Sequence, residues 1–79
     1  MTGRRYEKRQ RAATEAETRR RIVDATIALH ALVGGPSTTV TAIAARAGVS
    51  RLKVYRHFPD DHTLLAACTS TYLADHPQP

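Results

Sequence analysis

The chain has 79 residues, 42% of them hydrophobic, and a formal net charge of +5. A chain of this size buries only about 60% of the surface that its unfolded form exposes, so it can form a cluster of three or four helices but not a second domain or a roomy ligand cavity. The single cysteine, Cys68, excludes an intrachain disulfide, and the sequence has neither a secretory signal nor an apolar run long enough to span a membrane. These features indicate a small protein of the reducing cytoplasm.

The positive charge is concentrated near the N-terminus. Residues 1–21 hold eight basic and three acidic side chains, whereas residues 22–79 hold four of each. A second positive stretch, from Arg46 to His57, contains four basic residues and no acid. Two separate positive regions on a small domain indicate a polyanionic partner, although the N-terminal one taken alone could be a solvated charged tail.

The first helix is expected from about Ala12 to Val33. Residues 1–10 are polar and basic without apolar periodicity, and we expect them to form a disordered arm. Glycine and proline at residues 34–36 end the helix. Its apolar stripe consists of Ile22, Ala25, Thr26, Leu29 and Val33.

A short second helix is expected from Val40 to Ala47. Thr39 precedes it and can accept a hydrogen bond from a backbone N–H group of the first turn, as N-cap residues do. Gly48 follows it and suits a left-handed C-terminal position, because glycine has no Cβ atom.

A third helix is expected from Arg51 to His57 or Phe58, with Ser50 as its N-cap and Pro59 as its end. Asp60 can then cap a fourth helix, and residues 76–79 end the chain without structure. The apolar face of the fourth helix consists of Leu64, Leu65, Cys68 and Tyr72.

The stretch from Val40 to Pro59 has the spacing of a helix-turn-helix. Ala44 is small where a second helix must cross closely, and Gly48, four residues later, can make the sharp turn. Apolar residues that would hold both helices to the first are Ile43, Ala47, Val49 and Val54. An ordinary three-helix bundle with a glycine turn is the alternative. The expected fold is all-α: a homeodomain-like three-helix cluster with a helix-turn-helix, plus a fourth connecting helix.

The chain resembles the N-terminal domain of the tetracycline-repressor (TetR) family over about residues 20–68. The resemblance implies a DNA-binding domain at residues 11–79 of a bacterial transcription regulator, with repression as the expected effect. It also implies a homodimeric full-length protein on a palindromic operator, with a C-terminal dimerisation and ligand domain that is absent from this chain, so that the fragment itself is expected to be monomeric. The motifs that carry it are Thr38-Thr39-Val40, Ile43-Ala44, Ala47-Gly48-Val49-Ser50, Val54-Tyr55-Arg56-His57-Phe58 and Leu64-Leu65.

The resemblance further implies that the third helix enters the major groove of double-stranded DNA. Arg51 and Lys53 are candidates for base contacts, because both side chains can donate to guanine O6 and N7. Leu52 stands where family members often have glycine, and it either touches a thymine methyl group or packs sideways. The remaining candidate contacts, most of them to phosphates, are Thr39, Ser50, Tyr55, Arg56 and His57.

Outside that helix, Arg4 and Arg5 could add backbone or minor-groove contacts. Asp61 stands where the family commonly has a lysine, and we do not carry that phosphate contact over, because an acid repels phosphate. His57 and His62 lack the spacing of a helical zinc site, so neither a metal nor a cofactor is expected.

An enzyme is not expected, because the sequence has no nucleophile beside a base and no phosphate-binding glycine loop. The alternative function is a basic helical module that binds protein or membrane surfaces without sequence-specific DNA readout. In the favoured interpretation the protein acts in the cytoplasm, at the nucleoid.

Overall fold

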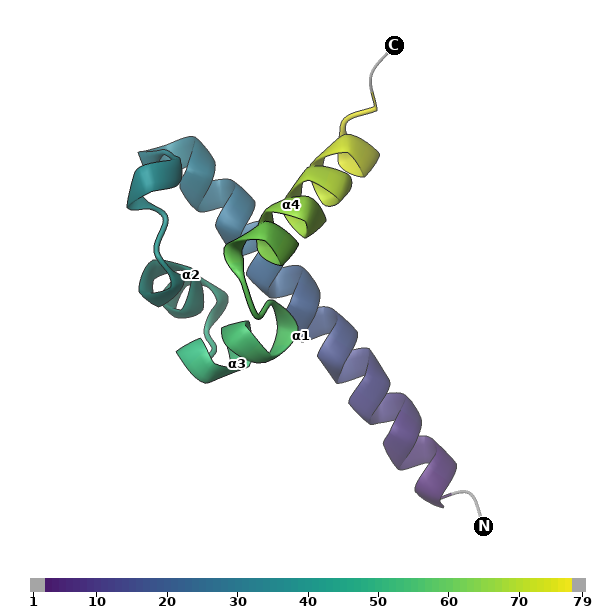
Figure 1. The fold of residues 1–79 in the computed structure, drawn as a ribbon. Coiled ribbons are helices and arrows are strands. Elements are labelled where there is room, and N and C mark those ends of the chain that lie inside the picture. Colours follow the sequence, from purple (N-terminus) through teal and green to yellow (C-terminus); the bar gives the residue numbers. More distant parts are fainter. Residues whose placement is uncertain (1–2, 78–79) are drawn as a thin grey trace.

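The computed structural model describes residues 3–77, and the side chains of residues 10–77. Its elements are α1 (Gly3–Val33), the 3-10 turn η1 (Gly35–Ser37), α2 (Val40–Ala47), α3 (Arg51–His57) and α4 (Asp61–Asp75). α1 is the longest helix. α2 and α4 pack against it, and α3 packs against α2 (Figure 1). The predicted all-α cluster of three helices with a fourth connecting helix is confirmed, and the bounds of α2 agree with the prediction.

α1 begins at Gly3, nine residues before the predicted start at Ala12, so the backbone is helical where we expected a disordered arm. Residues 4–21 are rich in Arg, Lys, Glu, Gln and Ala, which favour helix, and contain neither glycine nor proline. The prediction relied on apolar periodicity, which does not detect a helix made of charged and polar residues. Although α1 is long, neither it nor any other described helix is apolar enough to cross a membrane.

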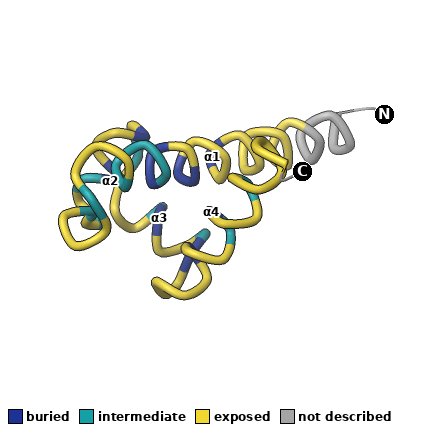
Figure 2. Tube along the Cα trace, turned by 90° about the horizontal axis from the view of Figure 1, so that it is seen from above, coloured by how far each residue is buried: buried dark blue, intermediate teal, exposed yellow. Residues whose placement is uncertain are grey.

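The core lies where the middle of α1 faces the other three helices (Figure 2). Of the predicted stripe on α1, Ile22, Ala25 and Thr26 are buried, whereas Leu29 is partly buried and Val33 is 51% exposed. The stripe is buried only along the length of α1 that its neighbours cover. The buried apolar residues are Ile22, Val23, Ala25, Ile43, Ala44, Ala47, Val54, Phe58, Leu64 and Cys68.

α4 buries only part of its predicted apolar face. Leu64 and Cys68 lie in the core, one helical turn apart, whereas Leu65 and Tyr72 are each 48% exposed. Cys68 packs near the backbone of α1, and burial raises the pKa of its thiol. The sequence-based expectation that Cys68 contributes packing agrees with this position.

The N-cap residues predicted for α2 and α3 are confirmed. The hydroxyl of Thr39 accepts a hydrogen bond from the N–H of Ala42 at 3.1 Å. The hydroxyl of Ser50 accepts one from the N–H of Lys53 at 3.2 Å. Each cap satisfies a backbone donor that has no partner within its helix, so the two short helices begin at defined residues.

Asp60 caps α4, as the sequence predicts. Its Oδ1 atom accepts hydrogen bonds from the N–H of Thr63 at 2.7 Å and from the hydroxyl of Thr63 at 2.8 Å. Both bonds favour the ionised carboxylate, the backbone one most, and they lower the pKa of Asp60. The start of α4 at Asp61 is thereby fixed.

Candidate functional site

The turn between α2 and α3 is built on Gly48. This residue has φ 72° and ψ 34°, in the left-handed region that glycine adopts without steric cost. Its N–H donates to the carbonyl of Ala45 at 3.3 Å, and the N–H of Val49 donates to the carbonyl of Ala44 at 3.0 Å. This pairing is the Schellman arrangement, which ends α2 and sets the direction in which α3 leaves it.

Arg21 of α1 completes the turn from the other side. Its Nη2 atom donates a hydrogen bond of 2.7 Å to the carbonyl of Ala47, the last residue of α2. A Cβ atom on Gly48 would lie 2.9 Å from that same nitrogen. Glycine is therefore required for its backbone conformation, whereas the end of the flexible Arg21 side chain would only have to shift to admit a Cβ atom.

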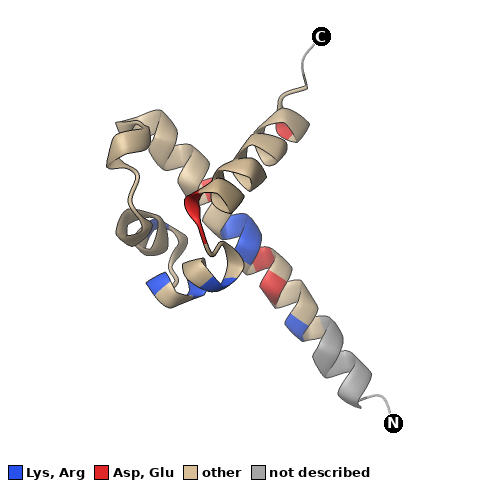
Figure 3. Ribbon diagram, in the orientation of Figure 1, with Lys and Arg blue, Asp and Glu red and all other residues tan. Residues whose placement is uncertain are grey.

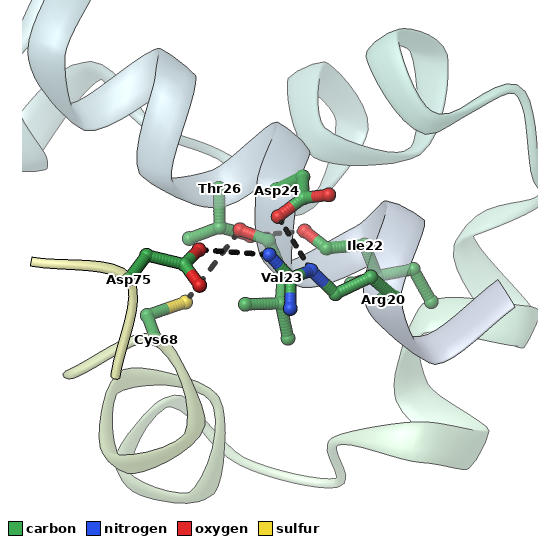
Figure 4. A network of polar contacts seen from close by, with 7 residues as sticks. All are labelled: Arg20, Ile22, Val23, Asp24, Thr26, Cys68 and Asp75. Atoms are coloured by element: carbon green, nitrogen blue, oxygen red, sulfur yellow. Dashed lines mark hydrogen bonds and ion pairs between the residues drawn. The ribbon is translucent and has the colours of Figure 1, made fainter. Parts of the chain in front are cut away.

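The neighbouring arginines of α1 also contact the protein itself. Arg19 stacks over the ring of Phe58 at 5.0 Å from the centroid. Arg20 pairs with Asp24 at 3.0 Å and with Asp75 of α4 at 2.8 Å (Figure 4), and the hydrogen bond to Asp24 is the main reason why its pKa is raised. The sequence suggested an exposed basic run here. It gave no signal for the contacts with Phe58 and Asp75, which lie outside α1, whereas the spacing of Arg20 and Asp24 is local.

α3 has one buried and one exposed side. Val54 and Phe58 are 1% and 2% exposed, respectively, and hold the helix to the core. Leu52 is 70% exposed and lies near the middle of the outer side, because successive helical residues are about 100° apart. We call the outer set the α3 exposed face; it consists of Arg51, Leu52, Tyr55 and Arg56.

Lys53 and His57 lie at the edge of α3 that is nearer to α1. Both are partly buried, and together with Arg56 and Glu15 they line a shallow hollow. His57 Nε2 lies 3.6 Å from Glu15 Oε2, and the His57 side chain is only 12% exposed. The structure thus turns His57 toward α1 and does not bring it onto the α3 exposed face.

Thr39 and Tyr55 come together although they belong to different helices. Both line a hollow between the start of α2, α3 and the start of α4, and Asp61 lines it as well. Tyr55 is 51% exposed, and Thr39 and Ser50 are exposed too. The hydroxyl oxygens of Thr39 and Ser50 accept the capping hydrogen bonds, so their hydroxyl protons remain available for donation to a ligand.

The charged residues of α3 are all basic. α3 contains two arginines and one lysine and no acid, and Figure 3 shows basic residues along it, with acidic ones at the connection to α4. The side chains of Arg4 and Arg5 lie outside the described ones, so their predicted contacts have no structural counterpart here.

A short helix that carries an exposed basic face and is held on a left-handed glycine turn defines a helix-turn-helix domain of the DNA-binding class. Residues 22–68 match the sequence model of a family described as bacterial regulatory proteins, tetR family. The chain belongs to this family. The match confirms the resemblance found in the sequence and, with it, the expected DNA-binding helix-turn-helix regulator domain.

Curated relatives carry the same kind of description. The chain is 46% identical over 50 residues to the uncharacterised HTH-type transcriptional regulator TtgW of Pseudomonas putida, covering 63% of this chain and 37% of that protein. It is 38% identical over 60 residues to an uncharacterised HTH-type transcriptional regulator of Mycobacterium tuberculosis, covering 76% and 32%. It is 44% identical over 50 residues to the HTH-type transcriptional regulator SrpR of Pseudomonas putida, covering 63% and 24%. The matched part therefore spans well under half the length of these relatives, and no solved structure matches the chain significantly.

Proposed function

We propose that this domain binds DNA sequence-specifically by placing α3 in the major groove. The observation that carries the proposal is the α3 exposed face: a helix of seven residues, anchored by Val54 and Phe58, presents Arg51 and Arg56 to solvent on the side away from the core. The major groove admits an α-helix, and the N-terminal residues of a recognition helix lie nearest the base edges.

The candidate residues divide by position. Arg51, in the first turn of α3, is the foremost base reader, and Lys53 is a second one at the edge of the groove. Arg56 and Tyr55, one turn along, face the phosphates.

The two N-cap hydroxyls, of Thr39 and Ser50, lie at helix N-termini, which favour phosphate binding. His57 would first have to leave Glu15 to reach a phosphate. Arg4 and Arg5 remain proposed backbone or minor-groove contacts at the start of α1.

The activity of the whole protein belongs to the same proposal, and we infer it from the family. The relatives that the chain matches are longer, and an isologous dimer with two such domains would read a palindromic operator. We propose repression as its effect, the cytoplasm and its nucleoid as its place, and no catalytic role.

Binding to selected DNA tests the function. The wild-type chain is used to enrich duplexes from a randomised pool, and its affinity is then compared between the enriched duplex, a scrambled duplex and anionic phosphatidylglycerol vesicles. We expect preference for the enriched duplex, and a log K that falls with log salt by about 0.9 per phosphate neutralised. Equal affinity for both duplexes, or stronger binding to vesicles, would support a surface-binding module instead.

Arg56→Ala and Arg46→Ala form a matched pair, because each removes one exposed arginine. Arg56 lies on the α3 exposed face, whereas Arg46 lies against α1, where it lines a hollow with Arg21 and Asp24. We expect Arg56→Ala to weaken binding to both duplexes by about tenfold and to lower the salt slope by about one, as the loss of a phosphate contact does. Arg46→Ala should change affinity by about twofold at low salt, through long-range charge alone. If both variants lose the same affinity in fluorescence-anisotropy titrations, Arg56 does not contact the DNA.

A further inference from the structure

The α3 exposed face includes an apolar residue, Leu52. Leu52 is 70% exposed, more than any other large hydrophobic residue of residues 10–77. It occupies the first turn of α3, and its neighbours on that face are Arg51, Tyr55 and Arg56. A sideways packing of Leu52 against this domain, the second alternative that the sequence left open, does not occur in the structure.

We infer that Leu52 is a specificity-determining residue that reads the C5-methyl group of a thymine in the major groove. The inference rests on the proposed function, because it requires α3 to lie in that groove. Base edges there present hydrogen-bonding groups at every pair, but only thymine presents a methyl group, and apolar side chains are its partners. A leucine at the centre of the face has no hydrogen bond to offer, so the thymine methyl is the feature that it can recognise.

The position of the flanking cations strengthens this assignment. Arg51 precedes Leu52 in the first turn, and Arg56 follows one turn later on the same face. With Arg56 on a phosphate and Arg51 on a guanine, the side chain between them is held against the base edges and shielded from water. The α3 exposed face then recognises guanine through hydrogen bonds that Arg51 donates, and an adjacent thymine through apolar contact with Leu52.

Replacing thymine by deoxyuridine tests the contact, because this change removes the methyl group and leaves the hydrogen-bonding pattern of the base unchanged. Each thymine of the enriched half-site is replaced in turn, and affinity is measured for the wild-type chain, Leu52→Ala and Leu32→Ala. Leu32 is a matched control, since it is 67% exposed but lies near the C-terminal end of α1.

At one thymine we expect deoxyuridine to weaken binding of the wild-type chain and of Leu32→Ala by about fourfold, the size of one buried methyl group. Leu52→Ala should bind the unmodified duplex about tenfold more weakly and be insensitive to the replacement. Wild-type binding that is unaffected at every thymine, or Leu52→Ala that keeps the sensitivity, would overturn the inference while the preference for enriched over scrambled DNA leaves the proposed function standing. Absence of that preference would overturn both.

Discussion

Gly48→Ala is expected to lower the free energy of unfolding by about 1–2 kcal/mol, mainly through left-handed backbone strain. The strain arises because Gly48 has φ 72°. The contact with Arg21 adds little: the new Cβ atom would lie 2.9 Å from Arg21 Nη2, which donates to Ala47, but the end of that flexible side chain can shift. Urea unfolding followed by far-UV circular dichroism measures the change.

Gly35→Ala is the matched control for this prediction. A Cβ atom at Gly35 meets nothing within 4 Å, so its effect should stay within about 0.5 kcal/mol, as at ordinary surface positions. In an Arg21→Ala background the cost of Gly48→Ala should stay at about 1–2 kcal/mol, because the backbone strain does not depend on Arg21. Similar unfolding midpoints for Gly48→Ala and Gly35→Ala would contradict the role assigned to the turn.

Arg51→Ala is expected to lower the preference for enriched over scrambled DNA by about 1–3 kcal/mol, or about 5- to 150-fold, the value of one bidentate base contact. Arg51 is exposed in the first turn of α3, where recognition helices approach the bases. Affinity for scrambled DNA should remain nearly intact. Competition titrations with the two duplexes measure both quantities.

Arg51→Lys separates base reading from charge. Lysine keeps the positive charge and can still donate to guanine, but a single ammonium group replaces the rigid planar fork of donors that arginine presents to O6 and N7. We expect this variant to lose most of the preference while keeping the wild-type salt slope. If Arg51→Ala weakens binding to both duplexes equally, Arg51 contacts phosphate and another residue reads the base. If Arg51→Lys retains the preference, recognition does not depend on the guanidinium fork.

The helix-turn-helix could be predicted from the sequence because its determinants are local. N-cap chemistry at Thr39 and Ser50, the glycine at position 48 and the proline after α3 each act within a few residues of the boundary that they set. The family resemblance added the expectation that this third helix enters the major groove.

Other features depend on contacts between distant residues, and sequence patterns did not predict them. The hydrogen bond from Arg21 to Ala47 spans 26 residues, and the contact of His57 with Glu15 joins the end of α3 to α1. The helical backbone before Ala12 was missed because a segment of charged and polar residues has no apolar period. In the same way, periodicity alone does not show which part of an apolar face a neighbouring helix covers, as Leu65 and Tyr72 illustrate.

The most direct test of the central claim is an amide chemical-shift titration of the isotope-labelled chain with the enriched duplex. If α3 lies in the groove, the largest shifts will fall on residues 50–56 and on the start of α2 at residues 39–42, while residues 69–75 of α4 stay nearly unchanged. Shifts concentrated in α4, with α3 unaffected, would contradict the account.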